Sequence, residues 1–260
     1  MNTEKIIRSQ AKKSLNGNWA VAVSGLFVLL AELFLVTVFY SILTGLTRLY
    51  DGEKLKPGAE PIMIIILVFT LLLCFALSPF ENGFYRLCYN IASDRSDGLR
   101  DMFYFFSGTK QYFKALQFNI IIALKKILYS IIGFAPYIIF EIIKSIVLMT
   151  ASSASLTQTF GVVEAIIFAV CTVAAVIINI RLVIPEFVFV DNFEANVFDI
   201  AKAISKKHIK EYYKLIATFI IWILSCMFVL PALYVIPYLT TSLGTTSKWL
   251  INMYKEGKTV

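Results

Sequence analysis

The chain carries little charge for its length. Charged residues make up 16% of its 260 residues, whereas hydrophobic residues make up 58%. A soluble globular domain has about 25% charged and about 45–50% apolar residues, so this composition excludes an ordinary soluble domain. The apolar residues also form long blocks, and about 20 such residues in a helix cross the roughly 30 Å hydrocarbon layer of a bilayer. We therefore expect an integral membrane protein.

Residues that build metal and redox sites are scarce. The only histidine, His208, lies in a lysine-rich polar segment, and the four cysteines form neither a CxxC nor a Cys/His pattern. A cysteine inside an apolar block usually serves as a small hydrophobic residue, so a metal or disulfide framework is not expected. We expect no metal and no cofactor. The cysteines are Cys74, Cys88, Cys171 and Cys226.

Enzymatic signatures are also missing. The sequence has no Gly-rich phosphate loop, no HExxH and no GxSxG, so we expect a protein that is not an enzyme. Its net charge of +7 comes from Lys and Arg residues that flank the apolar blocks. Such residues set membrane topology and contact anionic lipid headgroups, and there is no separate basic domain that would bind nucleic acid.

The apolar blocks predict an all-α fold, a polytopic bundle of about six transmembrane helices forming a single membrane domain over residues 1–260. Amphipathic segments rich in Lys and Arg predict cytoplasmic surface helices between the spans. Positive-inside counting places both termini in the cytoplasm; a count of five spans is the alternative. The expected spans are about 19–43, 62–80, 127–149, 160–184, 212–229 and 232–254, and the expected surface helices are about 3–17, 81–114 and 195–212.

The apolar stretch at 115–149 is too long for one simple span, because a helix of this length extends about 52 Å. Lys125 and Lys126 can mark the cytoplasmic boundary, which leaves 127–149 as a span kinked at Pro136. Alternatively, Gly133 and Pro136 break the helix. We favour the first interpretation.

Charged residues inside spans are the best functional candidates, since each costs about 2.5–3.5 kcal/mol at a helix centre on insertion scales. Glu32 lies near the middle of the first span. It is either a protonated or hydrogen-bonded carboxyl, which we favour, or a carboxylate that handles protons or cations. Glu141 and Lys144 are spaced for an ion pair on one helix face near the outer interface. Glu164 is expected in the first turn of its helix, where the helix dipole favours a carboxylate.

Five segments together resemble a family of bacterial integral membrane proteins, the domain of unknown function 975 (DUF975) family. They are AKKSLNGNW at 11–19, SPFENGFYR at 78–86, DMFYFFSGTKQYFKAL at 101–116, FVFVDNFEANVFDIAKAISK at 187–206 and VIPYLTTSLGTTSKWLINMY at 235–254. The resemblance implies a multi-pass protein of the bacterial cytoplasmic membrane and no known activity. The family-like positions are Trp19, Pro79, Glu81, Gly83, Asp191, Asn192, Pro237 and Tyr238.

Two functions fit these observations. The first is a non-catalytic scaffold or modulator of envelope components, which the amphipathic segments favour. The second is a small transporter or permease component, which Glu32 and the proline-interrupted region at 231–237 favour. The expected partners are the lipid bilayer, anionic lipid headgroups at the cytoplasmic face, and a membrane-protein partner or a second copy of the chain.

Overall fold

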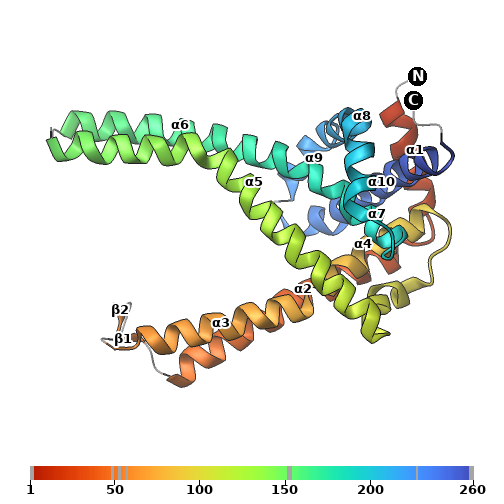
Figure 1. Ribbon diagram of the computed structural model, residues 1–260, viewed down its shortest axis with the longest axis horizontal. Helices are drawn as coiled ribbons and strands as arrows, with labels where there is room; N and C mark the ends of the chain where they lie inside the picture. Colours follow the sequence, from red (N-terminus) through yellow and green to blue (C-terminus); the bar gives the residue numbers. More distant parts are fainter. Residues whose placement is uncertain are drawn as a thin grey trace. The chain divides into compact units, whose positions relative to one another are not determined.

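The computed structural model describes residues 3–47, 50–51, 54–56, 58–150, 154–226 and 228–257. These residues are almost entirely helical (Figure 1), so the predicted all-α class is confirmed. The described strands are β1 (Tyr50–Asp51) and β2 (Lys54–Leu55), a short antiparallel pair. The chain forms two compact units, Met1–Ile120 with Pro185–Val260, and Ile121–Ile184.

The first unit contains a hairpin of two apolar helices, α2 (Trp19–Thr47) and α3 (Glu60–Leu77), which lie side by side (Figure 1). Most of their large apolar side chains are exposed, including Phe34 and Leu72. A helix that is apolar on all sides and not covered by protein suits a lipid environment. Thr37 and Thr70 do not interrupt this surface, because each hydroxyl donates to the carbonyl four residues earlier in its own helix.

The rest of the first unit is a packed body that we call the helical core. It consists of α1 (Thr3–Leu15), α4 (Pro79–Ala92), η1 (Gly98–Phe106), α8 (Val197–Ala217) and α10 (Val229–Lys255). Helix α4 packs against η1, α10, α2 and α1, and α10 packs against α1 and α8. The short helix α9 (Ile220–Ser225) connects α8 to α10.

Helix α4 differs from the expected surface segment at 81–114. Ser78 ends α3 and Pro79 begins α4, where the missing N–H of a proline costs no hydrogen bond. Nine residues of α4 are buried, because its apolar side chains face several neighbouring elements rather than one membrane surface. Gly83 allows the closest approach, since a Cβ atom there would lie 2.1 Å from the carbonyl oxygen of Met102 in η1.

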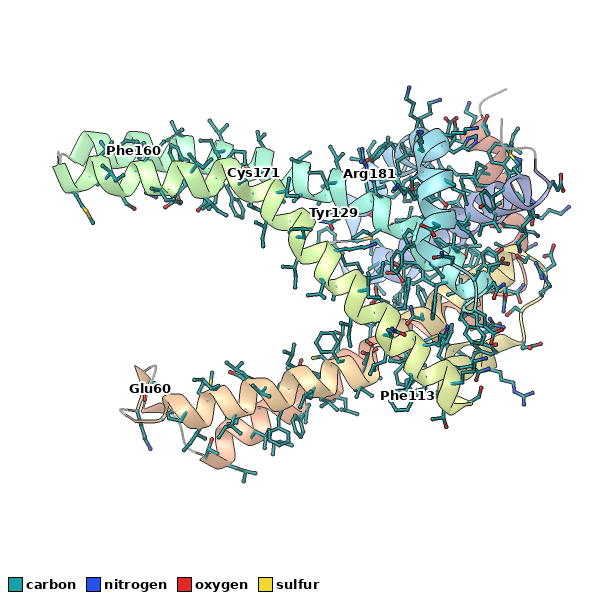
Figure 2. All side chains as sticks on the ribbon, viewed as in Figure 1. Glu60, Phe113, Tyr129, Phe160, Cys171 and Arg181 are labelled. Atoms are coloured by element: carbon teal, nitrogen blue, oxygen red, sulfur yellow. The ribbon has the colours of Figure 1, made fainter. Side chains whose placement is uncertain are left out.

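The second unit is a hairpin formed by the later part of α5 (Thr109–Thr150) with α6 (Ala154–Asn179) and the short η2 (Ile180–Leu182). Figure 2 shows its side chains, with Phe160 and Cys171 labelled on α6. The helices approach closely at Gly133, where a Cβ atom would lie 2.8 Å from the Cα atom of Ala175. Helix α5 continues through Gly133 and Pro136, so the alternative in which these residues break it is wrong. The boundary at Lys125 and Lys126 and the kink stay predictions.

Four helices in the described part of the chain are long and apolar enough to cross a membrane: Trp19–Thr47, Glu60–Ala92, Thr109–Met149 and Phe160–Asp191. They include the first four expected spans, and on this basis we treat the chain as a membrane protein. The number of spans, their orientation and the cytoplasmic termini stay predictions, as does the bacterial cytoplasmic membrane.

The expected helix at 212–229 is not continuous. Helix α8 ends at Ala217, and a tight turn precedes Phe219, whose amide donates to the carbonyl of Ile216. The apolar run suggested one helix, but Phe219 is fully buried in the core and fixes the chain where the run should continue. Helix α10 does cover the expected helix at 232–254. It carries buried hydroxyl groups, including those of Thr241 and Ser242, and packs in the core.

Candidate functional site

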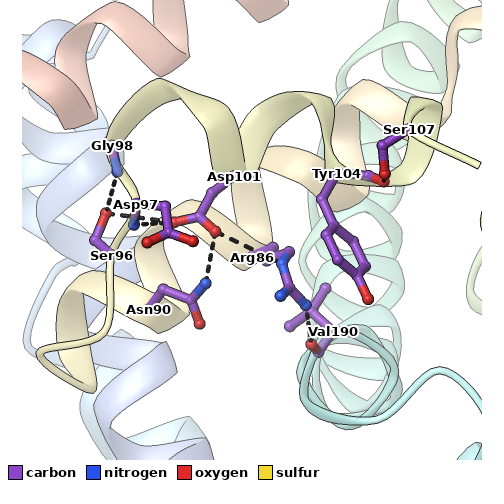
Figure 3. Close-up of polar contacts among 9 residues, drawn as sticks. All are labelled: Arg86, Asn90, Ser96, Asp97, Gly98, Asp101, Tyr104, Ser107 and Val190. Atoms are coloured by element: carbon purple, nitrogen blue, oxygen red, sulfur yellow. Dashed lines mark hydrogen bonds and ion pairs between the residues drawn. The ribbon is translucent and has the colours of Figure 1, made fainter.

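The most developed polar cluster of the helical core surrounds Asp101 in η1 (Figure 3). The Asp101 side chain is only 3% exposed, and its Oδ1 atom lies 3.6 Å from Nε of Arg86 in α4. Asn90 donates its side-chain N–H to Oδ1 at 2.7 Å. The backbone N–H of Asp97 and the hydroxyl of Ser96 donate to Oδ2 at 3.1 and 3.3 Å. One carboxylate thus holds η1, its preceding loop and α4 together.

Arg86 joins this cluster to a third element. Its Nη1 donates to the carbonyl oxygen of Val190 at 3.2 Å, and Val190 belongs to α7 (Val183–Asp191). Its guanidinium carbon lies 3.6 Å from the centre of the Tyr104 ring, a cation–π contact. A pocket of about 480 Å³ adjoins these groups and is also lined by the exposed Arg100 and by Phe103.

Burial raises the pKa of Asp101 above its ordinary value of 3.8. The hydrogen bonds from Asn90 and from the Asp97 amide, together with the charge of Arg86, oppose this shift without cancelling it. Desolvation disfavours the charged form of a carboxyl, whereas donors and a nearby cation favour it. The site is therefore a partly desolvated ion pair that holds three chain segments in place.

A second polar cluster surrounds Asp191, a family-like position at the end of α7. Its Oδ1 accepts from the hydroxyl of Tyr89 at 2.8 Å, and its Oδ2 lies 2.7 Å from Nζ of Lys255. The neighbouring Asn192 accepts the backbone N–H of Glu194 at 3.1 Å and so shapes the turn. Glu194 forms an ion pair with Lys110, whose hydrogen bond lowers the pKa of the Glu194 carboxyl.

The other family-like positions also lie in the first unit. Trp19, the first residue of α2, stacks on Tyr234 with ring centres 4.7 Å apart. The Tyr238 hydroxyl donates to the backbone oxygen of Arg8 at 3.2 Å. Pro79 and Gly83 are buried in α4, and Pro237 lies within α10. The structure thus brings residues from distant parts of the sequence into one body.

Glu32 lies half-buried on α2, and it is not electrostatically isolated. Glu81, in the first turn of α4, is an electrostatic neighbour of Glu32. Glu81 and Glu186 also act electrostatically on Tyr85, and Glu186 is 3% exposed. Sequence reasoning singled out Glu32 and Glu81 separately and missed Glu186, which lies in an apolar run next to Pro185.

The second unit holds its own charged cluster. Nζ of Lys144 lies 3.0 Å from Oε1 of Glu141 one turn earlier, and 2.6 Å from Oε2 of Glu164 on α6. The Tyr137 hydroxyl donates to Glu164 at 3.4 Å. Glu164 is not in the first turn of its helix, because α6 begins earlier, at Ala154. Its partner is a lysine of the opposite helix rather than the helix dipole.

Sequence reasoning also missed Arg86 and Asp101 as a pair. Both lie within family-like segments, and Asp101 introduces an aromatic run in which an acidic residue has no apolar packing role. In the sequence alone, this position is the only signal that Asp101 is a buried carboxylate, because its partner Arg86 lies on a separate helix.

In the ranges that the structure describes, no group of three or more His, Cys, Asp or Glu side chains is arranged to hold a metal ion. The family model described as "Protein of unknown function (DUF975)" matches residues 1–245. No curated protein and no solved structure matches the chain.

Proposed function

The chain belongs to the DUF975 family, and we propose that it is a non-catalytic scaffold or modulator that binds another component of the cell envelope through its helical core. One observation carries this proposal. Polar side chains of different family-like segments pair with one another, as in Arg86–Asp101 and Lys110–Glu194. Such pairs keep the helical core in one fixed shape, and a binding partner recognises a surface of fixed shape.

The outer face of α8 supports an interaction at the membrane surface. The helix buries Ala201, Ile204, Tyr212 and Leu215, and its lysines point away from the core. Each lysine near an anionic bilayer contributes about 1 kcal/mol to membrane attraction. This face would lie at the level of the anionic headgroups, where the partner binds it. The exposed lysines are Lys202, Lys206, Lys207, Lys210 and Lys214.

Photo-crosslinking in intact membranes tests the proposal. A photoreactive amino acid replaces the exposed Ala203 of α8 or, as a matched control, the exposed Phe34 of the apolar hairpin. We expect one discrete protein adduct from Ala203, heavier than the 29.4 kDa chain, and lipid adducts from Phe34. A second copy of the chain would give an adduct of twice that mass. No protein adduct from α8 would contradict the proposal.

A small transporter is the second candidate, and the position of Glu32, half-buried within a candidate span, favours it. A carboxylate within a span can take up a proton or attract a cation, since an isolated charge is costly there. Purified chain in proteoliposomes would then show pH-dependent flux that Glu32→Gln abolishes. Glu60→Gln, at the exposed start of α3, is the control. Flux that survives Glu32→Gln would reject this candidate.

A further inference from the structure

Residues 220–224, 228 and 230 are large apolar side chains that the described part of the chain leaves exposed. They include some of the most exposed large apolar residues of the first unit. Ile221 is 81% exposed, Phe228 is 72% exposed and Leu230 is 79% exposed. We call residues 220–226 and 228–230 the apolar turn, which comprises α9 and the start of α10.

The apolar turn is too short and too irregular to cross a bilayer. Helix α9 has six residues and so extends about 9 Å, whereas a span must cover roughly 30 Å. Backbone groups outside regular helices are costly in hydrocarbon, so a chain that breaks before and after α9 must keep these breaks near the polar interface.

Both ends of the apolar turn are fixed to the same place in the core. The chain leaves the core at Phe219, which is fully buried, and returns at Val235, which is 2% exposed. The Phe219 ring lies 5.1 Å from that of Tyr238, and the guanidinium of Arg8 lies 4.9 Å from the Phe219 ring. The chain thus comes back to its starting point, as a turn does and a single span does not.

Aromatic contacts place the apolar turn beside the start of a candidate membrane span. Trp19 begins α2, and its ring stacks on Tyr234. The centre of the Tyr234 ring also lies 6.5 Å from that of Trp222 in α9. Tryptophan and tyrosine concentrate at membrane–water interfaces, where an apolar ring with a polar atom is favoured. The exposed apolar side chains of the turn therefore lie beside a helix that is long and apolar enough to cross a membrane.

We infer that the apolar turn dips into one leaflet of the bilayer beside the start of α2, and returns without crossing it. The occupant of this surface is lipid, and an interfacial helix of this kind buries its apolar face about 5–10 Å deep. The core is then held at the membrane by the turn as well as by α2. Six spans, or four spans with a dipping turn, both leave the C-terminus on the same side of the membrane as the N-terminus. The position of the C-terminus therefore cannot distinguish them, and the turn itself must be probed.

The test uses the full chain with its four cysteines replaced by alanine and one reporter, Phe228→Cys, reconstituted in lipid vesicles. Gly58→Cys, between α2 and α3, and Lys206→Cys, on α8, mark the two sides of the membrane. A membrane-impermeant maleimide reports the side, and a fluorescent maleimide with nitroxide-labelled lipids reports the depth. Leu224→Cys, 65% exposed, is a second reporter in case the first variant fails to fold.

We expect loss of reporter fluorescence with nitroxides near the headgroups, greater than with nitroxides at the bilayer centre, and no labelling from the Gly58 side. Labelling from the Gly58 side would show that the segment crosses the membrane. A reporter that lipid nitroxides do not quench would show that water or another protein covers it. Either result would overturn the inference.

Discussion

Gly83→Ala tests whether the close approach of α4 to η1 holds the helical core together. The added Cβ atom would lie 2.1 Å from the carbonyl oxygen of Met102 and 2.9 Å from its Cα atom. These are backbone atoms, so no flexible side chain can move aside, and α4 and η1 must separate. Because the Asp101 cluster spans the same two elements, the separation also strains the contact between Asp101 and Arg86.

Overpacking of a dense interior costs about 1–3 kcal/mol. For a chain of this size, each kcal/mol lowers the melting temperature by about 2–4 °C. We therefore expect Gly83→Ala to lower the melting temperature of the purified protein in detergent by about 2–12 °C. Tryptophan fluorescence and circular dichroism, followed together on heating, measure this change.

The matched control is Gly45→Ala. Gly45 also lies within a helix, but a Cβ atom there would meet nothing within 4 Å. Replacing an exposed helical glycine by alanine stabilises a helix by about 0.5–1 kcal/mol. The two variants should therefore shift the melting temperature in opposite directions. Equal melting temperatures for the two variants would refute the claim that the contact at Gly83 is close-packed.

Three further predictions concern the other clusters. Asp101→Ala should destabilise the core more than Asp101→Asn, which keeps an acceptor for Asn90. Because burial raises the folded-state pKa of Asp101 above 3.8, wild type should lose stability relative to Asp101→Asn as pH rises through that pKa. Melting curves of the two proteins recorded at several pH values measure this loss. Gly133→Val should separate α5 from α6 and increase proteolysis of the hairpin, whereas Gly161→Val, with open space around it, should not. Lys144→Met should lower the yield of inserted protein by leaving Glu141 and Glu164 unpaired, and adding Glu164→Gln should restore much of it; no rescue would contradict the interhelical pairing.

Local features of the structure could be predicted from the sequence. The apolar blocks that contain α2, α3, α5 and α6 were found because the length of a continuous apolar run suffices to identify them. The proximity of Glu141 to Lys144 follows from helical spacing alone. Their third partner, Glu164, did not follow, since it depends on the register of α6 against α5.

The arrangement of the core could not be predicted in the same way. The sequence predicted a surface segment that includes α4 and a span that includes α10, and the structure shows that each helix is packed among others. Composition does not distinguish burial in protein from burial in lipid, because both favour apolar side chains. The pairing of Arg86 with Asp101 likewise depends on the fold of the loop between their elements. Pattern in the sequence identified these segments, and only their packing shows what each residue contacts.

The central claim, that the helical core binds another envelope component, is tested most directly by the mass of the complex extracted from native membranes. Native mass spectrometry in lipid nanodiscs compares wild type with Glu32→Gln and with Lys206→Gln/Lys210→Gln on the outer face of α8. The account predicts one partner at fixed stoichiometry, retained in Glu32→Gln and weakened in the α8 variant. A chain found alone in wild-type membranes would contradict it, most clearly if the protein also showed flux that depends on Glu32.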